Sequence, residues 1–120
     1  MKRINLTQHE STPEQDCIPR SDELASAIKG LLTFHELPTM REIVERAQAL
    51  AEIAHKSGAQ EAMIGGAPYL MEALAPALRM AGIVPVYAFS LRESVDEKQA
   101  DGSVIKRTVF RHAGFVRMEQ

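Results

Sequence analysis

The stretch from residue 61 to residue 89 limits the possible folds of this chain more than any other. It begins with the strand-like "EAMIGG", continues with the helix-like "PYLMEALAPALRMAG" and ends with the apolar "IVPVYAF". Pro68 stands where the first turn of a helix tolerates proline, and the glycine pair before it permits a sharp turn. A strand, a helix and a second strand in this order are typical of the parallel crossover unit of α/β proteins.

One strand and two helices are predicted before this unit. "RINL" at residues 3–6 has the pattern of a short strand, and a long loop rich in turn residues follows it. The helix of "SDELASAIKGLL" begins after Ser21 as N-cap. The helix of "LPTMREIVERAQALAEIAHKSGA" begins near Pro38 and Thr39 and stops at Gly58.

The C-terminal third predicts an antiparallel hairpin. Asp101-Gly102 is a strong turn pair between a segment that ends near Val95 and a segment that runs from Val104 to about Val116. The whole pattern predicts an α/β fold, a three-layer Rossmann-like domain with a mostly parallel sheet and a C-terminal antiparallel hairpin. Because the chain has only 120 residues, we expect residues 1–120 to form a single domain.

Composition argues against several classes of protein. The hydrophobic fraction of 45% is that of an ordinary globular protein, and no apolar run approaches the roughly 20 residues of a membrane helix. No secretory signal is recognisable, so we expect a cytoplasmic protein, in which Cys17 has no internal disulfide partner. The net charge of −2 argues against coating of long nucleic acids. No spaced Cys/His set suggests a metal, and no cofactor is expected.

Three loops should meet at the carboxyl ends of the parallel strands, where ligands bind in open α/β sheets. They are "TQHE", "GGAP" and "SLRES", after the first, second and third strand. Gly65 and Gly66 can adopt positive φ and expose their N–H groups, and the following helix directs its unpaired amides to the same place. This pattern predicts a seat for an anion, unless the glycines serve only to turn the chain.

Polar side chains in the other two loops could complete such a site. His9, with Thr7 and Gln8, directly follows the first strand and could contact a phosphate or transfer a proton. The alternative for His9 is a solvated loop histidine. Ser90 and Arg92 would share a strand face, and a hydroxyl beside a guanidinium suits phosphate. The alternative is a polar hairpin face on which Arg92 pairs with a nearby acid.

A cluster of basic residues lies near the C-terminus, although the net charge of the whole chain is negative. Between residues 104 and 117 there is no acidic residue, and the basic residues there are Lys106, Arg107, Arg111 and Arg117. Arg111 and His112 are neighbours, so a strand would point them to opposite sides. Structural pairing across the hairpin is the simplest account of both.

The C-terminal third, "GIVPVYAFSLRESVDEKQADGSVIKRTVFRHAGFV", resembles small CRISPR-associated proteins related to CARF domains, the ring nucleases that act on cyclic oligoadenylates. The resemblance covers residues 82–117. It is most specific in "PVYA", in the arginine-bearing turn after it and in "VFRH", with looser agreement at "MIGGAP". It implies a role in antiviral defence and a homodimer with a basic pocket on its twofold axis.

The resemblance also implies a cleavage that needs no metal ion. A ribose 2′-hydroxyl attacks its own phosphodiester, while amide and cationic groups stabilise the developing charge. The amides of Gly66 and Ala67 would hold a phosphate, and the guanidinium groups of Arg92 and Arg111 would neutralise it. The Ser90 hydroxyl would orient a phosphate oxygen, and the His9 imidazole would accept the proton.

Two other functions are compatible with the same sequence. The pocket could bind without catalysis, as in a sensor or sponge that sequesters a nucleotide signal. Alternatively, the chain could be a small interaction protein whose long hairpin pairs with a partner, with glycines that only turn the chain.

Overall fold

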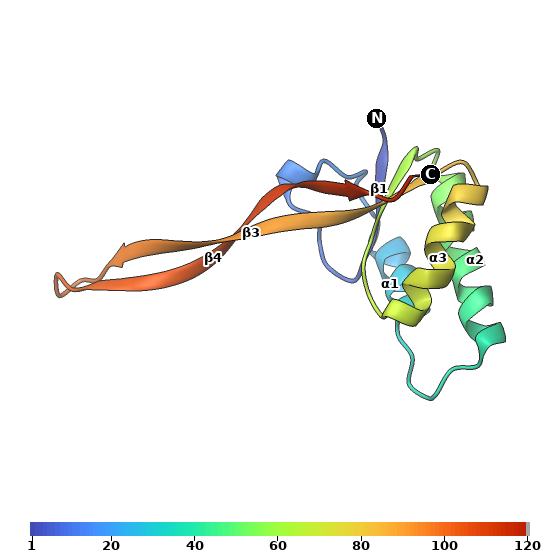
Figure 1. The fold of residues 1–120 in the computed structure, drawn as a ribbon, viewed down its shortest axis with the longest axis horizontal. Coiled ribbons are helices and arrows are strands. Elements are labelled where there is room, and N and C mark those ends of the chain that lie inside the picture. Colours follow the sequence, from blue (N-terminus) through green and yellow to red (C-terminus); the bar gives the residue numbers. More distant parts are fainter. Residues whose placement is uncertain (120) are drawn as a thin grey trace.

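A four-stranded sheet organises the chain, which a computed structural model describes for residues 1–119 (Figure 1). β1, β2 and β3 are parallel, and β4 is antiparallel to β3, in the spatial order β1-β2-β3-β4. The strands are β1 (Arg3–Leu6), β2 (Glu61–Ile64), β3 (Val84–Lys98) and β4 (Val104–Arg117). The predicted Rossmann-like α/β fold with a C-terminal antiparallel hairpin is confirmed. Gln120, the last residue of the predicted single domain, lies outside the described residues.

The helices begin where the sequence predicts them. The Ser21 and Thr39 side chains each accept a hydrogen bond, at 3.1 Å in both cases, from the amide three residues later. Pro68 is the first residue of its helix. No helix among residues 1–119 has the length and apolarity that a membrane span requires. The helices are α1 (Asp22–Leu32), α2 (Met40–Lys56) and α3 (Pro68–Met80), with a short 3₁₀ helix η1 (Pro13–Gln15).

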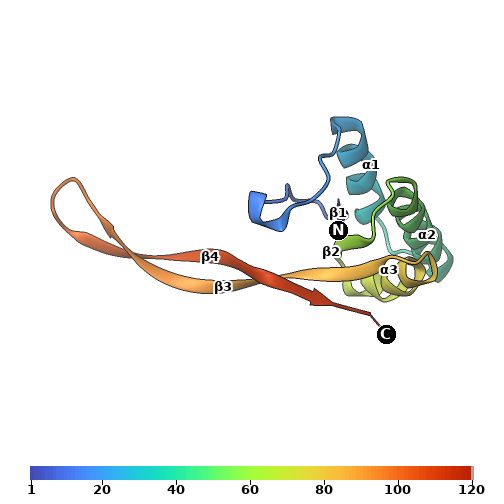
Figure 2. The same cartoon turned by 90° about the horizontal axis from the view of Figure 1, so that it is seen from above.

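All three α-helices lie on one face of the sheet (Figure 2). The order β1-β2-β3 never reverses, and crossovers of one hand that step in one direction place their helices on the same side. The segment of residues 7–20, which contains η1, covers the opposite face. There the Arg3 guanidinium donates a hydrogen bond to the Gln15 carbonyl. The three layers are therefore helices, sheet and this N-terminal segment.

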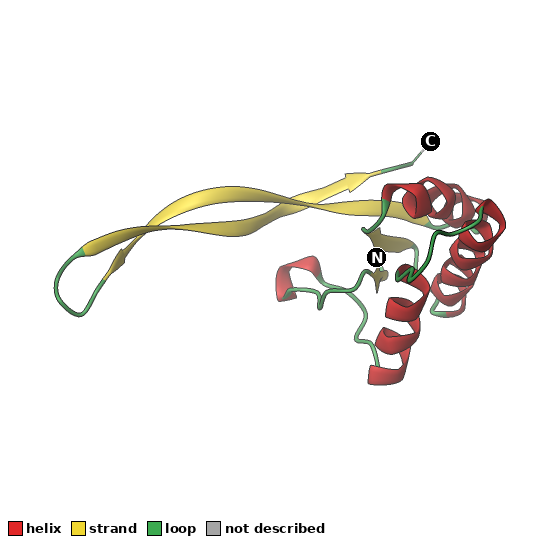
Figure 3. Cartoon of the chain, turned by 90° about the horizontal axis from the view of Figure 1, so that it is seen from below, coloured by secondary structure: helices red, strands yellow, loops and turns green. Residues whose placement is uncertain are grey.

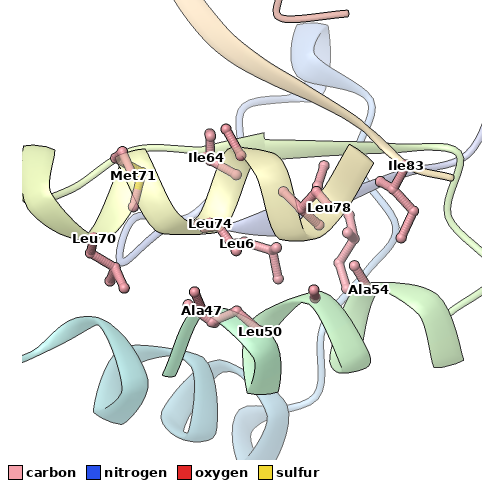
Figure 4. Packing of buried hydrophobic residues seen from close by; sticks show 14 of the residues in the cluster. Leu6, Ala47, Leu50, Ala54, Ile64, Leu70, Met71, Leu74, Leu78 and Ile83 are labelled. Atoms are coloured by element: carbon pink, nitrogen blue, oxygen red, sulfur yellow. The ribbon is translucent and has the colours of Figure 1, made fainter. Parts of the chain in front are cut away.

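The core lies between the sheet and the helices (Figure 4). Leu6 of β1, Leu50 of α2 and Leu74 of α3 have no exposed surface, and Figure 4 shows them facing one another. Each buried side chain of this size contributes about 1.5–3 kcal/mol of transfer free energy. Packing of the helices against the first three strands therefore stabilises the body of the molecule.

A buried carboxylate joins β1, β2 and β4 on the face opposite the helices. Glu61 is 2% exposed, and Arg3 approaches its Oε1 at 2.8 Å. Arg117 also pairs with Glu61, and the Arg3 guanidinium lies 4.0 Å from the centre of the Phe115 ring. A buried charge needs such partners. One member of the predicted basic patch, Arg117, thus has a structural role.

The outer part of the hairpin projects from the rest of the molecule (Figures 1 and 3). β2 ends at Ile64, so within residues 1–119 the part of β3 beyond Phe89 pairs with β4 alone. We call residues 90–112 the arm and the remaining described residues the body. The prediction that "SLRES" forms a loop is wrong, because β4 pairs with β3 as far as Lys98 and keeps this segment extended.

Candidate functional site

A pocket of about 530 Å³ opens at the carboxyl ends of the three parallel strands, where the sheet topology predicts one. Its volume lies within the range of about 300–1,000 Å³ that is usual for ligand sites. Five of the predicted site residues line it. These are Thr7, Gln8, His9, Gly65 and Gly66. The pocket therefore unites two of the three loops that we expected to meet.

Buried polar groups hold the loop after β1 in place. Asn5 is 1% exposed, and its Oδ1 accepts hydrogen bonds from the Thr7 hydroxyl at 2.6 Å and the Thr7 amide at 2.9 Å. Its Nδ2 donates to the His9 carbonyl at 2.7 Å. Arg20 donates to the carbonyls of Asn5 and Thr7 at 2.9 Å each, and to that of His9 at 3.2 Å. The Thr7 hydroxyl thus stabilises the loop, and the backbone of His9 is fixed.

The turn after β2 presents backbone N–H groups at the pocket. Gly66 has a φ of 149°, which favours glycine, whereas Gly65 does not have a positive φ. Ala67 is the N-cap of α3, and no side chain caps this helix end. Among the hydrogen bonds found within residues 1–119, none satisfies the amides of Gly66 or Ala67. These two amides, with the positive end of the α3 dipole, can bind an anion.

The remaining chemistry of the pocket comes from an exposed imidazole, a phenol and a carboxylate. The His9 side chain is exposed, and Tyr87 is partly buried against the core. Burial raises the pKa of Tyr87, so its hydroxyl remains protonated and can donate a hydrogen bond. The Glu10 carboxylate lies 3.9 Å from the Arg20 guanidinium. No group of three or more potential metal ligands occurs among the described residues.

Of the other predicted site residues, Ala67 precedes α3 outside the pocket lining, and Ser90, Arg92 and Arg111 lie on the arm. Ser90 and Arg92 continue the strand face of Ala88, which lines the pocket, and Arg92 lies 5.5 Å from the centre of the Phe110 ring. Arg92 forms no ion pair within residues 1–119, so the predicted pairing with an acid is not observed. Arg111 occupies the opposite face and pairs with Glu93 at 3.1 Å. The cross-hairpin pairing predicted for Arg111 is confirmed, and the two guanidinium groups do not meet within one chain.

The chain matches the Uncharacterized protein MJ1673 family over residues 1–116. It belongs to this family. The matched residues include the pocket, the helices and the arm, so the family model spans both the body and the arm. Neither the curated proteins nor the solved structures give a match.

Sequence reasoning missed several residues that shape the pocket of this MJ1673 family member. Tyr87 is one of them, and its position where the third strand leaves the parallel part of the sheet could have suggested a place in the site. Asn5 is a polar residue in an otherwise buried strand, which is a detectable signal. No local pattern indicates that Arg20 returns to β1, because that contact depends on the path of the intervening loop.

Proposed function

We propose that this chain binds a cyclic oligoadenylate in the pocket at the carboxyl ends of β1, β2 and β3, and cleaves it. One observation carries the proposal. The pocket combines His9, on a fixed backbone, with Gly66, whose amide and that of the next residue, Ala67, are unpaired among the described residues. An imidazole beside an anion-binding turn suits a reaction in which a proton leaves a hydroxyl near a phosphate.

The proposed reaction is a transesterification. The ribose 2′-oxygen forms a bond to the adjacent phosphorus, and the bond from phosphorus to the 5′-oxygen breaks. His9 takes the proton of the 2′-hydroxyl, and water supplies a proton to the departing 5′-oxygen. The products are a 2′,3′-cyclic phosphate and a 5′-hydroxyl. The amides of Gly66 and Ala67 stabilise the negative charge on the nonbridging oxygens.

A ligand longer than one nucleotide would continue along the arm. Arg92 is four residues beyond Ala88 on the same strand face, a distance of about 13 Å at about 3.3 Å per residue. Ser90 lies between them and would orient a phosphate oxygen. Arg111 lies on the other face of the arm and pairs with Glu93, so it takes no part in this contact. A homodimer, a cytoplasmic location and a role in antiviral defence belong to this proposal.

The test uses purified protein with cyclic tetra-adenylate and cyclic hexa-adenylate. We expect a higher melting temperature with one of these ligands, and linear products that chromatography resolves. His9→Ala should lower kcat by about 100-fold or more with little change in KM. The matched control is His35→Ala, because His35 does not line the pocket and should be dispensable.

The outcomes separate the enzyme from its alternatives. If the protein binds the ligand without forming product, and His9→Ala binds it equally well, the protein is a sensor or sponge and not an enzyme. Absence of any thermal shift with either ligand would refute binding of oligoadenylates. An interaction module is favoured by a separate observation, the exposed apolar side chains of the arm, which include Ile105 and Phe110 at 54% and 69% exposure.

A further inference from the structure

One face of the arm carries four apolar side chains among four charged ones, and no other element among residues 1–119 covers it. Leu91 and Val95 of β3 alternate with polar residues and point to the same side. The register places Ile105 and Val109 of β4 on that side, since they pair with Glu97 and Glu93. Leu91 is 49% exposed and Ile105 is 54% exposed. We call the side chains of Leu91, Val95, Ile105 and Val109 the apolar face.

The apolar face continues a buried face of the body. Pro85 and Tyr87 precede Leu91 in the same alternation along β3. Pro85 is fully buried and Tyr87 packs against the core, on the side of the sheet that the helices cover. Beyond the helix layer the same alternation carries Leu91 and Val95, separated by Glu93, and no helix lies over this part of the ribbon (Figure 2). The apolar side chains of this face therefore extend the helix-covered face of the body into a region where no other element lies over them.

The opposite face of the arm has a different character. Ser90, Ser94 and Thr108 lie on it, with Phe110 as its most exposed apolar side chain. A two-stranded hairpin with both faces in water is marginally stable. Covering the apolar face would remove its side chains from water and stabilise the arm.

The charged side chains that lie on the same side of the arm as the apolar face indicate which structure could cover it. Glu93 pairs with Arg111 at 3.1 Å, and Glu97 pairs with Arg107 at 3.4 Å. The two acids lie on β3 and the two bases on β4, so the face is neutral overall but acidic along one strand and basic along the other. A twofold axis along the ribbon would place the acidic strand of one copy over the basic strand of the other.

We propose that the apolar face binds the same face of a second copy of this chain, with β3 of each copy over β4 of the other. This identifies the surface for the homodimer that belongs to the proposed function. The inference rests on the arm alone, and its test needs no ligand. A protein that does not bind oligoadenylates would therefore not contradict this interface. A protein that does not dimerise through the arm would not contradict the proposed role of the pocket.

The first experiment measures the mass of the full chain in solution by light scattering and sedimentation. The unaltered protein should be a dimer, and Leu91→Glu should make it a monomer with an unchanged circular dichroism spectrum. Phe110→Glu is the matched control, because it places the same charge on the opposite face of the arm. That variant should remain a dimer. A monomeric unaltered protein, or a dimer that survives Leu91→Glu, would overturn the interface.

The second experiment tests whether these charged residues of one arm contact those of another. One variant carries Glu93→Arg with Glu97→Arg, and the other carries Arg107→Glu with Arg111→Glu. Each variant alone should be monomeric, because both strands of its arm then carry the same charge. An equimolar mixture should form a one-to-one heterodimer, in which each basic arm meets an acidic arm. A mixture that stays monomeric would refute a contact between these charged faces of two arms.

Discussion

The body and the arm share the strands β3 and β4 but are stabilised in different ways. Val86, where β3 lies between β2 and β4, has no exposed surface, whereas Val104 near the tip of the hairpin is 59% exposed. The body buries leucines from strands and helices, while the arm depends on the backbone hydrogen bonds of one strand pair and on exposed ion pairs. A continuous hairpin can thus serve as core at one end and as contact surface at the other.

The largest expected difference is in the response to truncation of an apolar side chain. Leu74→Ala should lower the free energy of unfolding by about 3 kcal/mol, because it leaves a cavity in the fully buried core. Val104→Ala should change it by less than about 0.5 kcal/mol. Urea denaturation of both variants provides the measurement. Equal losses would mean that the arm is packed as tightly as the body.

The second comparison concerns charged groups. Arg20→Ala should cost about 2 kcal/mol, since the buried guanidinium satisfies three carbonyls of the loop after β1. Arg107→Ala removes an exposed ion pair of the arm and should cost less than about 1 kcal/mol. Urea denaturation of dilute protein separates this effect from dimer formation. An equally small loss in Arg20→Ala would show that the pocket loop does not need this anchor.

The third comparison uses two glycines that have positive φ. Gly66→Ala should lower the global free energy of unfolding by about 1–2 kcal/mol, because its φ of 149° strains any other residue. Gly102→Ala has the same local problem at a φ of 88°, but it should increase amide hydrogen exchange only in the arm. Gly65→Ala, without positive φ, is the control and should be close to neutral. Global destabilisation by Gly102→Ala would show that the arm and body unfold as one unit.

The smallest expected effect is a pH dependence at the tip of the arm. The Ser103 hydroxyl and amide donate to Asp101 at 2.6 and 2.9 Å, and these hydrogen bonds lower the pKa of Asp101. A lowered pKa in the folded state stabilises the turn above the ordinary value of 3.8, and this contribution is lost as the pH falls through the folded value. Amide exchange at residues 102–104 should therefore rise in acid relative to the body. Asp101→Asn should abolish that difference, and a variant that retains it would exclude Asp101 as the cause.

Local sequence signals predicted the helices and the turn with good reason. Ser21 and Thr39 cap helices because their hydroxyls reach an amide three residues away, an interaction that needs no distant partner. Gly66 was predicted to line a ligand site because the turn between a parallel strand and its helix lies at the carboxyl edge of the sheet. These inferences depend on residues close together in the chain.

The interpretation of "SLRES" as a loop failed for a different reason. Ser90 and Arg92 are polar residues at alternating positions, which suits a turn region as well as an exposed strand. The partner strand decides between the two, and Phe110 and His112 of β4 lie directly opposite these residues. This pairing carries the predicted phosphate ligands beyond the lining of the pocket and onto the arm.

The sequence by itself determined the helix boundaries, the parallel crossover unit, the hairpin turn and the glycine turn, because backbone conformation responds to neighbouring residues. Only the tertiary structure decided that Arg20 returns to hold the loop of His9, that Arg111 turns away from Arg92, and that an apolar face of the arm is uncovered. Those features depend on strand register and on contacts between distant segments. Register is set by the packing of the whole chain, since a shift of one residue would move every side chain to the other face.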